Sequence, residues 1–185
     1  MRKLIMFFTV FLLFPQASSA TEIMPVDVRV GGGVLYVTTT VAPGAKFVDD
    51  LSEGLSKEVT IFVDLFRVWK IWPDEFIQGR KLTKILKSDP IRREYVASST
   101  EGDVQREKRF KDVESMLAWA MRISDLRLAV LSKLEPGEYF VKVTVEAQLR
   151  KLPPVVGQLL FFIPQKEFNV NKTSVPFQVP LRQDR

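Results

Sequence analysis

The sequence predicts a mainly β fold of the α+β class: an antiparallel β-sandwich with two or three short helices. Apolar and polar residues alternate along several segments, most regularly over residues 139–149. Strands with one apolar and one polar face are typical of antiparallel sheets, which bury one face and leave the other in water. Turn signals separate these segments, among them three consecutive glycines and an acidic Pro-Gly sequence.

Residues 1–20 have the three parts of a secretory signal peptide. Two cations precede an apolar run over residues 4–14, which is shorter than the roughly 20 residues that a bilayer span needs. Ser18 and Ala20 supply the small side chains that signal peptidase accepts. We therefore expect cleavage after Ala20, one β-rich domain over residues 21–185, and a location in the periplasm or outside the cell.

The first half of this domain predicts a hairpin, a short helix and a long strand. Residues 23–30 and 34–41 flank the glycines 31–33, which tolerate positive φ and suit a hairpin turn. Apolar residues at helical spacing then predict a short amphipathic helix over residues 47–55. Residues 59–72 are apolar on both faces, which predicts a long central strand covered on both sides.

The second half predicts further strands and one clear helix. The more basic strands are residues 80–86, 91–98 and 104–110. Asp112 can cap the helix that follows, whose apolar stripe extends to Ile123. Alternation then predicts strands over residues 126–130 and 139–149, and Glu135 to Glu138 suit a type II turn between them.

The composition excludes many enzyme classes. The chain has no histidine and no cysteine, which rules out serine-histidine-acid triads, cysteine nucleophiles and zinc sites built from imidazole or thiolate. We expect no cofactor and no metal. The formal net charge is +5, and removing Arg2 and Lys3 leaves about +3, a mild excess that gives no signature of a nucleic-acid partner.

Carboxylates remain as candidate catalytic groups. The candidates are Asp49-Asp50, Asp64, Asp74-Glu75 and Asp112 with Glu114. Two carboxyls across a cleft could hydrolyse a polysaccharide, with Trp69, Trp72 or Trp119 as aromatic walls, but no spacing selects a pair. Asp64 interrupts an apolar strand, so it lies either at an edge or solvent-facing position or in a buried site with a partner.

Two stretches are candidates for binding. Residues 80–111 are rich in cations, and we select Arg92, Arg93, Arg106 and Arg109 as contacts for an anionic membrane surface or an acidic envelope protein. A solvated strand face that resists aggregation is the alternative. Residues 152–164 are strongly apolar, and Leu159, Leu160, Phe161 and Phe162 either dock a partner or membrane or pack on the open end of the sandwich.

Five features follow one another along the chain. They are Leu65-Phe66-Arg67, Arg92-Arg93-Glu94-Tyr95, the helix over residues 112–123, the hairpin at Pro136 to Tyr139, and Leu152-Pro153-Pro154. Their order resembles the uncharacterised exported bacterial proteins of domain-of-unknown-function family 4390, over most of residues 24–180. Where members commonly carry Trp-Asn-Leu, this chain has Phe168-Asn169-Val170. The resemblance implies no known activity.

These observations favour an exported accessory or binding protein of the cell envelope, without enzymatic activity. A carboxylate-based hydrolase of envelope polysaccharide is the alternative, and a cleft that holds two carboxyls would favour it. A lipid-binding module is the third hypothesis. An enclosed apolar cavity in place of a packed core would identify it.

Overall fold

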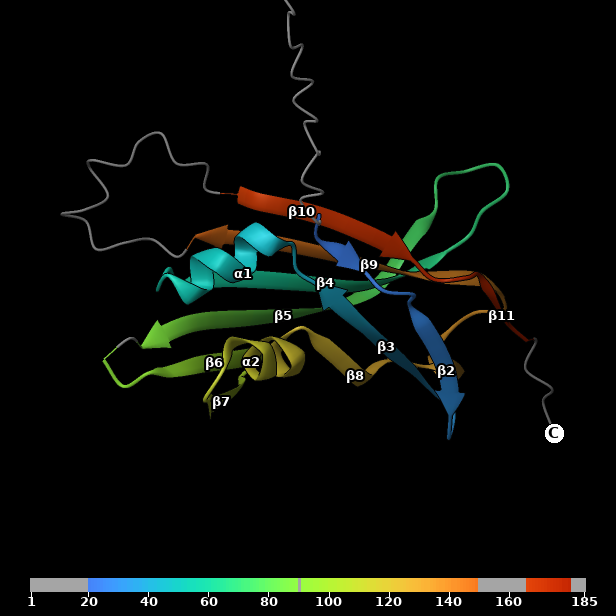
Figure 1. The fold of residues 1–185 in the computed structure, drawn as a ribbon. Helices are drawn as coiled ribbons and strands as arrows, with labels where there is room; N and C mark the ends of the chain where they lie inside the picture. Colours follow the sequence, from blue (N-terminus) through green and yellow to red (C-terminus); the bar gives the residue numbers. More distant parts are fainter. Residues whose placement is uncertain (1–19, 90, 150–165, 181–185) are drawn as a thin grey trace, which may run out of the picture.

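Two antiparallel sheets pack face to face in the computed structural model, which describes residues 20–89, 91–149 and 166–180 (Figure 1). Two short α-helices accompany the sheets, so the expected β-sandwich with few helices is confirmed. Among the described residues, no helix has the length and apolar character needed to cross a membrane.

The smaller sheet is built around β3. Its strands are β1 (Glu22–Ile23), β2 (Asp27–Gly31), β3 (Val34–Ala42) and β8 (Arg122–Val130). The expected hairpin is confirmed, because β2 pairs with β3 through a turn in which Gly32 and Gly33 have positive φ. The first strand is shorter than expected and is interrupted near Pro25, which has no N–H to donate to a ladder.

The larger sheet has the order β10-β9-β4-β5-β6-β7, and β11 also pairs with β9. Its strands are β4 (Lys57–Arg67), β5 (Glu75–Asp89), β6 (Glu94–Glu101), β7 (Val104–Phe110), β9 (Gly137–Leu149), β10 (Lys166–Thr173) and β11 (Phe177–Val179). β4 is central, as expected, but it ends at Arg67. Only one of its faces is fully buried, because the smaller sheet covers one side of the larger sheet.

Both predicted helices are present. α1 (Ala45–Ser52) is followed by Gly54, whose φ of +98° turns the chain and ends the helix. The Asp112 carboxylate accepts a hydrogen bond of 2.7 Å from the Ser115 N–H and caps α2 (Val113–Ala120). A short 3₁₀ turn, η1 (Leu131–Lys133), follows β8.

The core lies between the sheets and follows the strand alternation. The fully buried face of β9 comprises Tyr139, Val141, Val143, Val145 and Ala147, as the period-two pattern predicts. The hairpin expected at Pro136 to Tyr139 is wrong, because β8 pairs with β3 and β9 pairs with β4. The chain uses this connection to pass from one sheet to the other.

A candidate anion-binding groove

A groove opens where the larger sheet meets α2 and β8. It has a volume of about 700 Å³. Its lining residues come from β5, β6 and β7 on one side and from α2 and the start of β8 on the other. Its lining contains the cations Lys84, Arg106, Lys108 and Arg122 and the single carboxylate of Glu101.

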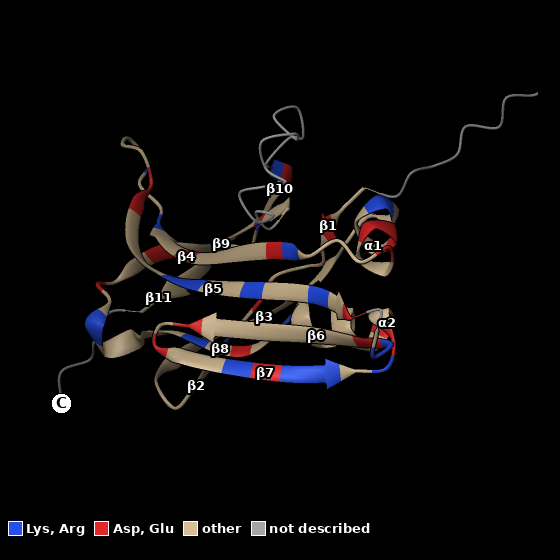
Figure 2. Cartoon of the chain, turned by 90° about the vertical axis from the view of Figure 1, so that its left-hand side faces the viewer, with Lys and Arg blue, Asp and Glu red and all other residues tan. Residues whose placement is uncertain are grey.

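The strand register explains how the cations converge. Lys84 on β5 pairs with Ser99 on β6, and Ser99 pairs with Arg106 on β7. Residues that pair across neighbouring strands lie on the same face of a sheet. Lys108 lies two residues beyond Arg106 and therefore shares that face, and the blue bands on β7 in Figure 2 show how basic this strand is.

Lys84 is the most enclosed of these cations. Only 6% of its surface is exposed. Its ammonium donates a 2.7 Å hydrogen bond to the Ser99 hydroxyl and lies 5.4 Å from the centre of the Trp119 ring. Burial lowers the pKa of Lys84; Glu101 opposes this effect, and the nearby positive charge of Arg106 adds to it. Lys84 therefore carries a charge that no described carboxylate neutralises through an ion pair.

Two aromatic rings form an apolar part of the groove lining beside these charges. The rings of Phe110 and Trp119 lie with their centres 5.8 Å apart. The Lys108 ammonium lies 5.3 Å from the Phe110 ring. Contacts of this kind hold cations by attraction to the ring face and leave their remaining N–H donors available to a ligand. The groove thus combines positive charge, hydroxyl groups and flat apolar surface.

The structure separates the four arginines that the sequence singles out. Arg106 lines the groove. Arg109 lies on the opposite face of β7, 3.6 Å from Glu94. Arg92 lies 3.9 Å from Asp89, and Arg93 takes a φ of +53° in the turn before β6. Docking through Arg92, Arg93 and Arg109 stays a prediction. The predicted apolar contact residues lie outside the part of the chain that the structure describes, so this prediction also stays open. They are Leu159, Leu160, Phe161 and Phe162.

Sequence reasoning missed part of the groove. Arg122 was not a candidate, because the apolar stripe predicts that it lies inside a helix that extends to Ile123, whereas α2 ends at Ala120 and Arg122 begins β8. Lys84 was one cation among many. One signal could have identified it: Lys84 lies between Leu82 and Leu86 in the buried phase of β5, where a charged side chain is unusual.

The candidate carboxylates come from several different elements of the fold. Asp50 is on α1, and Asp112 caps α2. Asp64 lies on the outer face of β4, over Gly79, where an added Cβ would overlap its carboxylate. Burial raises the pKa of Asp64, and Lys142 opposes the shift. Within the described part of the chain, no cluster of three carboxylates is placed to hold a metal ion.

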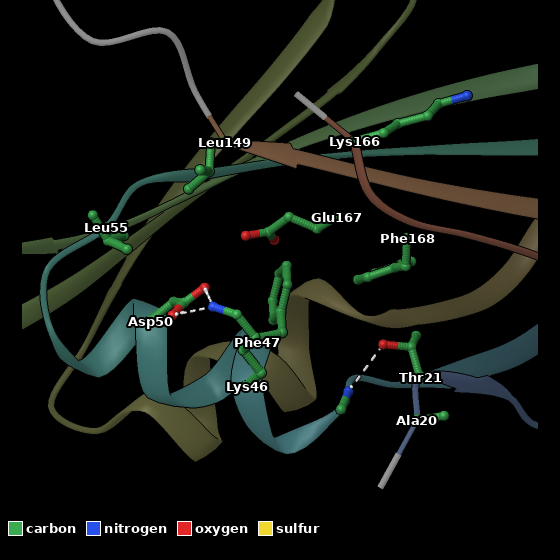
Figure 3. A pocket seen from close by; sticks show the side chains of 11 residues that line it. Ala20, Thr21, Lys46, Phe47, Asp50, Leu55, Leu149, Lys166, Glu167 and Phe168 are labelled. Carbon is green, nitrogen blue, oxygen red and sulfur yellow. Dashed lines mark hydrogen bonds and ion pairs between the residues drawn. The ribbon is translucent and has the colours of Figure 1, made fainter. Parts of the chain in front are cut away.

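A second pocket, of about 550 Å³, lies beside α1 and β10 (Figure 3). The fully buried ammonium of Lys57 donates to Asp50 at 2.6 Å and also to Glu167. Lys46 donates to both Asp50 oxygens at 2.9 Å. Desolvation would raise the pKa of Asp50, but the two lysines outweigh it and lower that pKa. The charges here neutralise one another, so this pocket attracts anions less than the groove does.

Comparison with known families gives one match. The family model described as a domain of unknown function (DUF4390) matches residues 18–176. No curated protein and no solved structure matches the chain.

Proposed function

The chain belongs to the DUF4390 family, and we propose that it is an exported, non-enzymatic binding protein of the cell envelope that holds an anionic group of its ligand in the groove. The anionic group is a phosphate or a carboxylate of an envelope component. The single observation that carries this proposal is Lys84, a nearly buried ammonium that has no carboxylate partner among the described residues and shares the groove with three other cations.

The energetic cost of burying the Lys84 charge favours binding of an anionic ligand. A buried charge is costly unless a partner of opposite charge or several hydrogen bonds compensate it. Ser99 satisfies one of the three donors of the Lys84 ammonium, and Arg106 adds repulsion. An anion in the groove would compensate Lys84 and Arg106 together, through charge-assisted hydrogen bonds that are stronger than neutral ones.

The chemistry of the lining favours binding over catalysis. Glu101 is the one carboxylate among the described residues that line the groove. A glycoside hydrolase needs two carboxyls that face each other across the substrate. The chain also has no histidine or cysteine to act as base or nucleophile. The groove residues can therefore attract, orient and hold an anion, and they offer no pair of carboxyls for glycoside hydrolysis.

Export is the part of the proposal that rests on the sequence. Residues 1–20 combine two cations, a short apolar run and a small-residue cleavage site. Residues 1–19 lie outside the described part of the chain. Export would bring the groove to the envelope, whose lipids and polymers carry phosphate and carboxylate groups.

Inorganic phosphate is a suitable probe of the groove. The chain has three tryptophans, so a Trp69→Phe/Trp72→Phe variant leaves Trp119 as the one tryptophan emitter. We expect phosphate at low ionic strength to change the Trp119 emission saturably, and added sodium chloride to weaken this binding. Lys84→Gln in that background should weaken phosphate binding at least tenfold.

Lys81→Gln is the matched control, because Lys81 is an exposed cation of the same strand on its outer face. It should bind phosphate within twofold of the parent variant. A parent variant without saturable response, or an equal loss in both lysine variants, would contradict the proposal.

A further inference from the structure

The connection between β4 and β5 projects away from the two sheets (Figure 1), and its large apolar side chains are exposed to water. It comprises residues 68–74, between the end of β4 and the start of β5. Trp69 is 43% exposed, Ile71 89% and Trp72 74%. Lys70 lies within this apolar group. We refer to residues 68–74 as the hairpin tip.

The base of the hairpin tip is tied to the body of the protein. The Val68 N–H donates a 2.8 Å hydrogen bond to the Glu138 carbonyl. Arg67 pairs with Glu135, and its guanidinium lies 4.5 Å from the centre of the Trp69 ring. These contacts fix where the tip leaves the sheet. Ile71 and Trp72 lie beyond these contacts, at the exposed end of the hairpin tip.

A single exposed apolar residue is common on protein surfaces, but a cluster marks a contact site. Phe76, at the start of β5, adds a further side chain that is 57% exposed. The hairpin tip lies at the end of the larger sheet away from α2 (Figure 2), so the proposed function of the groove does not account for this cluster.

We infer that the hairpin tip inserts into the headgroup region of a phospholipid membrane and holds the protein against that surface. Trp72 suits this position, because its ring is apolar and its indole N–H can donate near the headgroups. The Trp69 N–H already donates to the Glu75 carboxylate at 3.2 Å, so Trp69 contributes its apolar ring. Lys70 can extend its ammonium toward lipid phosphates while its aliphatic stem stays among the apolar side chains.

The shape of the tip favours a membrane over a protein partner. A stable protein interface buries about 800 Å² on each partner and usually involves 20 to 30 residues a side. The hairpin tip offers three large apolar side chains on a narrow projection. A membrane can accept such a projection without a matching pocket, since the lipid headgroups move aside.

Vesicle binding tests this inference. The naturally processed protein is mixed with vesicles of equal parts phosphatidylethanolamine and phosphatidylglycerol. Co-sedimentation gives the bound fraction, and tryptophan emission reports transfer of the ring out of water. We expect wild type to sediment with the vesicles and its emission to shift to shorter wavelength. Ile71→Ser/Trp72→Ser should weaken vesicle binding at least tenfold and leave Tm unchanged.

Ile91→Ser/Val175→Ser is the matched control, because it removes two apolar side chains that are 94% and 83% exposed elsewhere on the surface. This variant should bind vesicles like wild type. Wild type that stays in the supernatant, or an equal loss in both double variants, would overturn the inference. A tip variant that binds vesicles normally but loses a co-purifying protein would show that the tip docks on a protein instead.

Discussion

Lys57 and Lys84 are both withdrawn from water, with 0% and 6% of their surface exposed, yet their electrostatic surroundings differ. Lys57 contacts two carboxylates, Asp50 and Glu167. Lys84 contacts a hydroxyl and an aromatic ring. Removing a member of a buried ion pair leaves the remaining charge unpaired. Removing a charge that lacks a counter-ion relieves the cost of burying it.

These surroundings predict opposite effects of the same substitution on stability. Lys57→Met should lower the free energy of unfolding by about 3 kcal/mol or more, because Asp50 and Glu167 would be left close together without their cation. Lys84→Met should leave stability unchanged or raise it, because methionine fits apolar surroundings and removes an uncompensated charge. Urea denaturation near neutral pH measures both values.

The difference in free energy of unfolding between Lys84→Met and wild type should depend on pH. Because burial holds the folded-state pKa of Lys84 below the ordinary lysine value of 10.5, wild type bears the full cost of the buried charge at pH values below that folded pKa. Wild type then recovers stability as pH rises toward 10.5, since folding no longer requires a charged Lys84. A Lys84→Met variant that is markedly less stable than wild type near neutral pH would indicate a structural role for this lysine.

The surroundings of Lys84 and Lys57 could not be predicted from the sequence. The phase of β5 makes Lys84 unusual, but the sequence alone does not place Trp119 against it, since the two residues lie 35 positions apart in the chain. Lys57 was not singled out, because its carboxylates come from α1 and from β10, a strand that the sequence analysis did not expect.

At the scale of elements, the strands with regular alternation were predicted well. β9 is the clearest case, because the residues that alternate along its inner face from Tyr139 to Ala147 are all buried. The hydrophobic effect acts directly on this pattern, so little else is needed to place the strand. β10 was missed because its side chains are exposed or half-buried and give no such pattern. The end of β4 was misplaced because the apolar residues that follow it form the hairpin tip.

Val143 tests the account of β9. Its side chain is fully buried, and its strand neighbours on β4 and β10 are Val63 and Lys172. Val143→Asp should lower the free energy of unfolding by several kcal/mol, since it places a carboxylate in the core between the two sheets, against the buried Val63. Thr144→Asp, on the half-exposed face, is the control and should cost much less. Thermal denaturation of both variants that gave the same Tm would contradict the assigned faces of β9.

At the scale of the whole molecule, the groove exists because the two sheets differ in extent. The larger sheet continues through β6 and β7, and α2 carries the chain from β7 across to β8. The fold class could be predicted from local patterns. The groove could not, because it depends on the register of β5, β6 and β7 and on the placement of α2 against them.

β7 offers the most direct test of the groove, because its two faces carry cations in different surroundings. Arg106 and Lys108 line the groove, whereas Arg109 and Lys111 contact Glu94 outside it. Two double variants, Arg106→Gln/Lys108→Gln and Arg109→Gln/Lys111→Gln, remove the same charge from neighbouring positions. Any general effect of net charge is therefore equal in both.

The measurement is the dissociation constant for inorganic phosphate, determined at one low ionic strength for wild type and both double variants. The account predicts at least tenfold weaker binding for Arg106→Gln/Lys108→Gln, which corresponds to about 1.4 kcal/mol. It predicts a change of less than twofold for Arg109→Gln/Lys111→Gln. Equal weakening in the two variants, or none in either, would contradict the claim that the groove is the anion-binding site.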